Sequence, residues 1–314
     1  MVNLNFHSVA LEQHVKVCPC CKGTQWNLFS ALQYSSGYLN YQICSTCGLI
    51  FQSPQMSDKQ RTEFYAKCYR QFIFGQVDPP KIDIDIQDGR ARHLAKIIKD
   101  RYGNLTGEDH LDIGCGSGAL IRRLHELCGC NGAGIEPDDS YRKFAQSQGL
   151  DVFASLDEWK NSVGRRVKIV TISHVLEHLP DPLAFLVHIK EEILCASGIL
   201  LVEVPHLYFH PYFELVHIVA FSPHTIRQVL RMAGFKVMYF KQHGHPMRIT
   251  PRYMTILTEI ASSSTQSEIR IKGEPRGVKI KRSLGLSIDH IETKLLHFIK
   301  LGRNLASRLK ITQA

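Results

Sequence analysis

The middle of the chain alternates between short apolar runs and segments whose apolar residues recur at helical spacing. The predicted strands lie at residues 110–113, 132–136, 167–172 and 198–205, and the predicted helices at 119–127, 183–194 and 223–233. A last strand, at residues 252–260, is predicted to be antiparallel. Strands that alternate with helices in this way are typical of a parallel sheet covered by helices. The pattern therefore predicts an α/β fold.

Three glycines lie between the first predicted strand and its helix. Gly114, Gly116 and Gly118 occupy every second position, so the backbone can turn tightly beside a ligand without a Cβ clash. The next predicted strand ends in Glu136, about 20 residues further on, where nucleotide-binding sheets place the acid that holds ribose hydroxyls. The glycine spacing lacks the GxGxxG pattern that admits a pyrophosphate. We therefore expect a nucleoside ligand without one.

The sequence LDIGCGSG at residues 111–118 resembles the first motif of class I methyltransferases that use S-adenosylmethionine (SAM), and GIEPD at 134–138 resembles their ribose-binding acid. The resemblance covers residues 88–240. It implies a Rossmann-like sheet with SAM as cofactor. It also implies that Asp112 and the three glycines hold the methionine end of SAM and that Glu136 binds its ribose.

Two CxxC pairs lie near the start of the chain. Cys18 and Cys21 form the first, and Cys44 and Cys47 form the second, with 22 residues between the pairs. Each pair can turn two thiolates toward one tetrahedral Zn²⁺, and four Cys ligands leave no open position, so the metal is expected to be structural. Cys20 lacks the matching spacing and is expected to be a bystander.

A zinc ribbon followed by methyltransferase motifs resembles a bacterial family that includes sugar C-methyltransferases and enzymes of polysaccharide gene clusters. The likeness covers residues 18 to about 240. It implies transfer of a methyl group to a sugar, a nucleotide sugar or another small-molecule or glycan acceptor.

Several titratable residues follow the strand at 167–172. His174, Glu177 and His178 lie where open α/β sheets bind ligands, and a carboxylate beside a histidine can orient it as a base. We expect His174 to flank the cofactor. His178 is a candidate base for the acceptor proton, and His217, shortly before a Phe-Ser pair, is a second candidate by resemblance to the sugar enzymes.

Two alternative functions remain. The turn from His174 to His178 also resembles that of small-RNA 2'-O-methyltransferases, whose divalent metal is bound by two Glu and a His, plus a distant His. Glu177 and His178 match this pattern, whereas His174 replaces the first Glu. A noncatalytic SAM-binding scaffold is the other alternative.

Net charge is +9 at pH 7, and most of it lies at the C-terminal end. Residues 268–314 contain eleven Lys and Arg and four acids, so the other 267 residues carry only +2. This nearly neutral body argues against an extended nucleic-acid groove.

A basic amphipathic helix is predicted near the C-terminus. From residue 288 onward, basic residues lie between apolar positions at helical spacing, namely Ile291, Leu295, Phe298, Leu305 and Leu309. Such a helix can pack on its own domain, dock a partner or contact an anionic membrane surface.

The chain is predicted to have four parts. They are a zinc ribbon at 1–56, a helical connector and cap at 57–105, a SAM-dependent methyltransferase domain at 106–260, and a linker with a basic amphipathic helix at 261–314. No apolar run is long enough to span a membrane, and residues 1–17 lack the apolar core of a signal peptide. We therefore expect a cytoplasmic protein.

Overall fold

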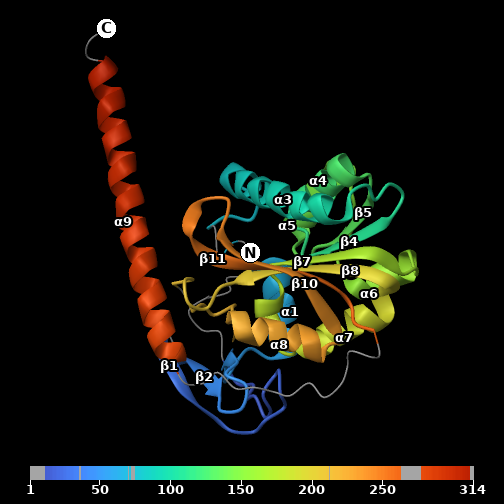
Figure 1. Ribbon diagram of the computed structural model, residues 1–314, viewed down its shortest axis with the longest axis horizontal. Helices are drawn as coiled ribbons and strands as arrows, with labels where there is room; N and C mark the ends of the chain where they lie inside the picture. The colour runs from blue at the N-terminus through green and yellow to red at the C-terminus, as the bar shows by residue number, and fades with distance from the viewer. Residues whose placement is uncertain are drawn as a thin grey trace.

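The computed structural model describes residues 11–34, 37–69, 71, 75–211, 213–262 and 277–311 (Figure 1). Most of the linker expected after residue 261 lies outside these residues. The described chain forms two sheets, one of seven strands and one of four.

The larger sheet has the strand order β10-β11-β8-β7-β4-β5-β6. The five strands from β8 to β6 are parallel, whereas β10 and β11 extend one edge as an antiparallel pair. The strands are Asp109–Ile113 (β4), Asn131–Ile135 (β5), Asp151–Phe153 (β6), Val167–Ser173 (β7), Leu194–Pro205 (β8), Phe235–Gly244 (β10) and Arg248–Ile260 (β11). The predicted α/β fold is confirmed.

Helices cover both faces of this sheet (Figure 1). The helices of the described chain are Asp58–Lys67 (α1), Lys81–Tyr102 (α3), Ala119–Cys128 (α4), Asp139–Ser147 (α5), Leu156–Ser162 (α6), Pro182–His188 (α7), Pro223–Met232 (α8) and Val278–Ile311 (α9), and α9 runs along the side of the body. The helix predicted at 183–194 is shorter than expected, because α7 ends at His188 and a π-helical turn, Ile189–Ile193, leads directly into β8.

The central strand β7 shows how the two faces are filled. Ile169 belongs to the core under α3 and α4, whereas Val170 and Ile172 belong to the core under α7 and α8. Successive side chains of a strand point to opposite faces, so a strand buried on both faces is apolar at nearly every position. This is why residues 167–172 are mostly apolar, with Lys168 and Thr171 as the exceptions.

The smaller sheet joins the cysteine module to the larger domain. Its order is β1-β2-β3-β9. The strands are Trp26–Tyr34 (β1), Gly37–Cys44 (β2), Ile50–Gln52 (β3) and Val219–Ala220 (β9). The edge strand β9 comes from the segment after β8, nearly 170 residues beyond its partner β3. The N-terminal module is therefore completed by backbone from the larger domain.

Tyr41 on β2 strengthens this junction. Its ring is fully buried, and its hydroxyl lies 2.6 Å from the carbonyl oxygen of Glu214 and 2.8 Å from that of His217. Both carbonyls can only accept, so the single hydroxyl hydrogen serves one or the other. The module thus contacts the backbone of the segment that carries a candidate base.

We expect Tyr41→Phe to lower the free energy of unfolding by about 1–2 kcal/mol, because it removes the buried hydroxyl that donates to one of these carbonyls. Urea denaturation followed by circular dichroism measures the change. Tyr38→Phe is the matched control, since Tyr38 lies on the same strand with an exposed ring. Equal stability of the two variants would show that the Tyr41 hydroxyl contributes nothing.

Candidate active site

The turn between β4 and α4 is built on glycines in the left-handed backbone region. The φ angles of Gly114, Gly116 and Gly118 are 75°, 54° and 73°. A Cβ atom at Gly114 would lie 2.4 Å from Val175 Cγ2, and one at Gly118 would lie 2.2 Å from Leu150 Cδ1. Backbone conformation and lack of space therefore both restrict these two positions to glycine.

Glu136 closes the turn from the end of β5. Its buried carboxylate accepts hydrogen bonds from the backbone N–H groups of Gly116 at 2.8 Å and Asp138 at 2.9 Å. The acid is thereby fixed at the edge where parallel sheets bind ligands. Its role in binding ribose stays a prediction.

Asp112 lies on β4 in a chain of buried polar groups. The Thr171 hydroxyl donates to Asp112 Oδ1 at 2.6 Å and lies 2.8 Å from His110 Nε2. Because the hydroxyl hydrogen goes to Asp112, His110 donates from Nε2. Burial, together with the charge of Glu136, raises the pKa of Asp112 to about 7, although the bond from Thr171 opposes the shift. A cation bound nearby would favour the ionised carboxylate.

A cavity of about 810 Å³ opens at this edge of the sheet. Among the residues that line it are Asp112, Gly114, Gly116, Glu136, His174, His178 and His217. Gly118 does not line the cavity and instead caps the N-terminus of α4. The structure therefore brings all but one of the expected cofactor and acceptor residues to a single space.

Helix α3 supplies part of the cavity wall that the sequence motifs do not indicate. Gln87 Oε1 accepts hydrogen bonds from the backbone N–H and the hydroxyl of Ser117 at 2.9 and 2.8 Å. Asp83, one turn earlier, accepts a hydrogen bond from the Tyr141 hydroxyl at 2.6 Å. In the sequence, Gln87 and Asp83 look like ordinary residues of a helix. Only their contacts with residues far away in sequence show that they belong to the cavity wall.

Helix α1 continues the wall to His178. Tyr65 lies on α1, and Tyr69 follows two residues after the helix ends at Lys67; both line the cavity. The Tyr65 hydroxyl lies 2.8 Å from His178 Nδ1, which is also 2.9 Å from the carbonyl oxygen of Val216. Because a carbonyl only accepts, Nδ1 carries a hydrogen and donates it. In the neutral ring of His178, Nε2 is then the proton acceptor.

Glu177 precedes His178 and is almost completely buried. Its Oε1 lies 3.2 Å from His174 Nδ1 and 4.0 Å from His178 Nε2. Neither carboxylate oxygen accepts a well-aligned hydrogen bond from the residues described here. Burial opposes ionisation, but His174, followed by His178, outweighs it and holds the pKa of Glu177 at about 2. Glu177 is therefore a buried negative charge.

Glu203 on β8 is a second buried carboxylate. It lies 3.1 Å from Arg90 Nε, 3.4 Å from His174 Nε2 and 3.3 Å from His243 Nε2, and it accepts a hydrogen bond from Thr255 at 2.8 Å. Burial opposes ionisation here too, but His174, followed by His243 and Arg90, outweighs it and holds the pKa of Glu203 well below its ordinary value. The carboxylate therefore stays ionised.

His174 lies between these two acids. Its φ of 57° is rare for a residue other than glycine and needs support from its surroundings. Burial and the charge of Arg90 favour the neutral ring, but Glu177 and Glu203 outweigh them and raise the pKa of His174. The ring lines the cavity where a cofactor neighbour is expected.

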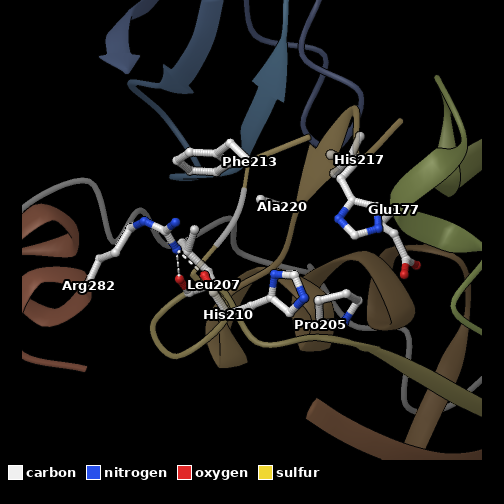
Figure 2. A pocket seen from close by; sticks show the side chains of 9 residues that line it. Glu177, Pro205, Leu207, His210, Phe213, His217, Ala220 and Arg282 are labelled. Atoms are coloured by element: carbon white, nitrogen blue, oxygen red, sulfur yellow. Dashed lines mark hydrogen bonds between the residues drawn. The ribbon is translucent and has the colours of Figure 1, made fainter. Parts of the chain in front are cut away.

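His217 lies beside His178, with the two ring centroids 4.9 Å apart. A second cavity, of about 20 Å³, adjoins His217 and Glu177 and is also lined by Arg282 from α9 (Figure 2). Burial, followed by the charge of His178, lowers the pKa of His217 well below its ordinary value. His217 is therefore neutral at pH 7.

These side chains can also meet at a cation. The ligand atoms of Glu177, His178 and His217 lie within 4.8 Å of one another. Two imidazoles and a carboxylate are ligands that divalent transition metals accept. The cluster could therefore either accept a proton from a bound acceptor or bind a metal ion, and the metal content of the protein distinguishes the two roles.

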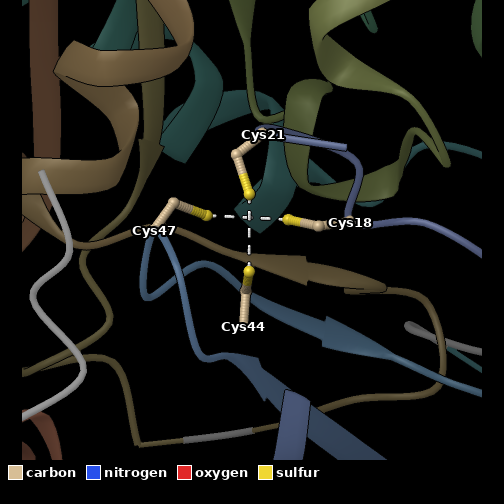
Figure 3. Close-up of side chains that lie close together, drawn as sticks. All are labelled: Cys18, Cys21, Cys44 and Cys47. Carbon is tan, nitrogen blue, oxygen red and sulfur yellow. Dashed lines mark hydrogen bonds between the residues drawn. The ribbon is translucent and has the colours of Figure 1, made fainter. Parts of the chain in front are cut away.

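The four paired cysteines converge on one centre (Figure 3). The Sγ atoms of Cys18 and Cys47 are 3.6 Å apart, those of Cys21 and Cys44 are 3.5 Å apart, and all four lie within 4.8 Å of one another. Zn–S bonds of about 2.3 Å in a tetrahedron place the sulfur atoms about 3.8 Å apart. The four thiols therefore fit a tetrahedral Zn²⁺ held only by protein.

Comparison with known proteins is consistent with this geometry. Residues 86–239 match the model of a family described as a methyltransferase domain. The structure is similar to that of 1,6-didemethyltoxoflavin-N1-methyltransferase of Burkholderia thailandensis, which was solved with S-adenosylhomocysteine. The TM-score is 0.50 at 16% sequence identity, and the match covers 68% of this chain and 96% of that one. The Rossmann-like methyltransferase fold implied by the sequence motifs is thereby confirmed.

Two curated relatives are ubiquinone biosynthesis O-methyltransferases. That of Nitrosospira multiformis is 34% identical over 92 residues, and that of Actinobacillus pleuropneumoniae is 30% identical over 114 residues. The matches cover 27% and 33% of this chain, and the chain spans only 38% and 48% of the relatives. Neither name refers to sugars, so the likeness to sugar C-methyltransferases stays a prediction.

We expect the native chain to bind one equivalent of zinc, and Cys44→Ser to lose it and to have a lower Tm, because folding of such a module depends on the bound metal. Mass spectrometry of metal content and thermal unfolding test this. Cys20→Ala is the matched control, because Cys20 Sγ contacts Met232 Sδ at 3.8 Å, on α8. Zinc retained by Cys44→Ser, or lost from Cys20→Ala, would contradict the ligand set.

Proposed function

We propose that the chain transfers a methyl group from SAM to a hydroxyl group of a small-molecule acceptor. The observation that carries this proposal is that one cavity contains both the glycine turn with Glu136 and the histidine pair His178 and His217. Its volume of about 810 Å³ lies within the range of about 300–1,000 Å³ typical of small-molecule sites. Names of the two curated relatives support an oxygen acceptor.

The residues of the turn fit SAM by charge and shape. Glu136 would bind the ribose hydroxyls, Asp112 and the backbone of Gly114 and Gly116 would hold the methionine end, and His174 would flank it. SAM, when bound, supplies an electron-poor methyl group on a positively charged sulfur. The acidic groups at this end of the cavity favour a cationic ligand, and a bound cation would keep Asp112 ionised.

His178 is the group proposed to accept the acceptor's proton. Its Nδ1–H is engaged by the Val216 carbonyl, so the Nε2 lone pair is available in the neutral ring. Nε2 would take up the proton of the acceptor hydroxyl. The ionised carboxylate of Glu177, 4.0 Å from Nε2, then stabilises the imidazolium.

Aromatic rings define the acceptor end of the cavity. Tyr65 and Tyr69 both line the cavity beside His178, and tyrosine rings are groups on which a sugar or an aromatic acceptor would stack. A nucleotide sugar or glycan, as implied by the sequence, therefore belongs in the first acceptor panel together with phenols. Methyl-labelled SAM incubated with that panel and with fractionated host extract identifies the acceptor. If the label enters no small molecule, the proposal is contradicted.

We expect Glu136→Gln to weaken SAM binding by about 10- to 100-fold, because it removes charged hydrogen bonds of about 1.5–3 kcal/mol. Isothermal titration calorimetry gives the Kd, and circular dichroism checks that the variant is folded. Glu126→Gln is the control, since Glu126 is an exposed partner of Arg123. An unchanged Kd in Glu136→Gln would remove this acid from the cofactor site.

We expect His178→Asn to lower kcat by about 10²- to 10⁴-fold, the usual contribution of a general base. A base must be unprotonated, so the rate falls as pH drops through its pKa. His217 has a depressed pKa and is already neutral at pH 7, so His217→Asn should keep that acidic limb whereas His178→Asn should abolish it. Loss of the limb in His217→Asn instead would transfer the role to His217.

Metal content tests the same assignment independently. If His178 acts as a base, the native chain should bind only one equivalent of metal, at the four cysteines. A second equivalent that disappears in Glu177→Gln would mean that Glu177, His178 and His217 hold a metal ion and that His178 Nε2 is a ligand.

A further inference from the structure

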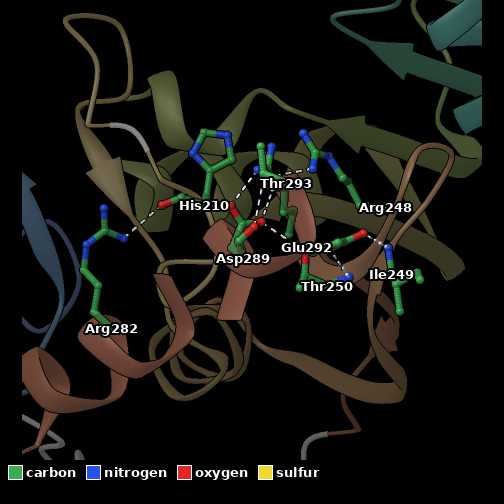
Figure 4. A network of polar contacts seen from close by, with 9 residues as sticks. His210, Arg248, Ile249, Thr250, Arg282, Asp289, Glu292 and Thr293 are labelled. Carbon is green, nitrogen blue, oxygen red and sulfur yellow. Dashed lines mark hydrogen bonds and ion pairs between the residues drawn. The ribbon is translucent and has the colours of Figure 1, made fainter. Parts of the chain in front are cut away.

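Helix α9 is attached to the body through its charged face. Glu292 accepts hydrogen bonds from the backbone N–H groups of Ile249 at 2.7 Å and Thr250 at 2.8 Å (Figure 4). Asp289 forms a two-pronged ion pair with Arg252 at 2.5 and 2.6 Å. Both acids are buried, so the negative charges of the helix are used in holding it to the body.

The first turns of α9 approach the segment after β8 in the same way. The buried guanidinium of Arg282 donates to the carbonyl oxygens of Leu207 and His210. A Cβ atom at Gly285 would lie 2.2 Å from the carbonyl oxygen of Tyr208, so the helix lies directly against backbone there. Val278 adds an apolar contact at the start of the helix. Polar and backbone contacts thus dominate the inward face.

The apolar stripe of α9 points the other way. Helices that cover a core normally turn their apolar stripe inward. Here five large apolar side chains are 52–68% exposed, namely Ile280, Leu284, Ile288, Ile291 and Leu295. Their spacing of three and four residues places them on one side of the helix. The expected positions Phe298, Leu305 and Leu309 continue this spacing, but their side chains lie outside the described residues.

The exposed charges of the described helix are basic. Lys294 is exposed, whereas Lys279 and Lys281, although exposed, lie over rings of the body, Phe29 at 5.7 Å and Tyr208 at 5.9 Å. The acids of the described helix, Asp289 and Glu292, are buried on the inward face. The sequence after Glu292 contains further Lys and Arg beyond Lys294 and no acid. In the described part of α9, the exposed charged side chains are therefore all basic, and Lys294 lies close to the exposed apolar side chains Ile291 and Leu295 along the helix.

We infer that α9 is a docking surface for a bilayer with anionic headgroups. An interfacial helix buries an apolar stripe at the boundary of headgroups and acyl chains while its lysines contact anionic lipid, and α9 offers both features. A second copy of this chain fits less well, because pairing two outward faces would bring lysines together with no exposed acid of the described helix to neutralise them.

The dimensions of α9 suit a helix that lies on the surface. Its 34 residues span about 50 Å at 1.5 Å per residue, and its C-terminal end projects past the body (Figure 1). In the described part of the chain, no helix has the length and apolarity needed to cross a bilayer. Because the contacts of Asp289 and Glu292 with the body lie on the inward face, the outward face of α9 can contact the bilayer while these contacts stay intact.

Vesicle flotation of the full chain tests this inference. We expect binding to vesicles of phosphatidylcholine and phosphatidylglycerol mixed three to one, little binding to phosphatidylcholine alone, and weaker binding as salt rises. Leu284→Gln with Ile291→Gln should weaken binding at least tenfold, because both substitutions replace apolar side chains that would be buried in the bilayer with polar ones. Lys294→Gln should weaken it about fivefold.

The matched control is Leu127→Gln with Val163→Gln, which removes two exposed apolar side chains from elsewhere on the surface and should bind as the native chain does. SAM binding by all samples should be unchanged, so this test is independent of the proposed chemistry. Equal flotation of both double variants would overturn the inference. A second result would also overturn it. Sedimentation would show that the native chain is a dimer, that this dimer does not bind vesicles, and that only the α9 double variant dissociates it.

Discussion

The buried charge of Glu203 is the interaction on which the edge of the large sheet depends. One carboxylate, without access to water, contacts α3 through Arg90, the end of β7 through His174, and the antiparallel extension through His243 and Thr255. An ionised group in such a place is tolerated only when its partners compensate the lost hydration. Each partner is therefore fixed in position, and removing any one would leave the others around an undercompensated charge.

That constraint reaches the proposed chemistry through a short series of contacts. Glu203 supports His174, His174 contacts Glu177, and Glu177 lies beside the ring of His178. The unusual backbone conformation of His174 is maintained in this series, because its ring is attracted by an acid on either side. Alternating charges thus reach the ring of His178, which is also held through its Nδ1 by the Val216 carbonyl.

The fold was largely predictable, and the acceptor end of the cavity was not. Alternating apolar runs, the glycine turn and the paired cysteines are local patterns, and local patterns suffice to predict the α/β sheet and a candidate cluster of four cysteines. Gln87, Glu203 and Arg90 carry no such pattern, since each acquires its role by contact with residues far away in sequence. The charged inward face of α9 was equally hidden, because the period of a helix shows which residues share a side but not which side faces the body.

The strand β9 has a consequence for how this chain can change over evolutionary time. Although only two residues long, it pairs with β3, so the small sheet is built from both the N-terminal module and the segment after β8 that also carries His217. A cysteine module of this kind cannot be exchanged as a cassette. Recombination that replaced it would also have to supply a compatible edge strand from the segment that carries His217, so the two regions are expected to be inherited together.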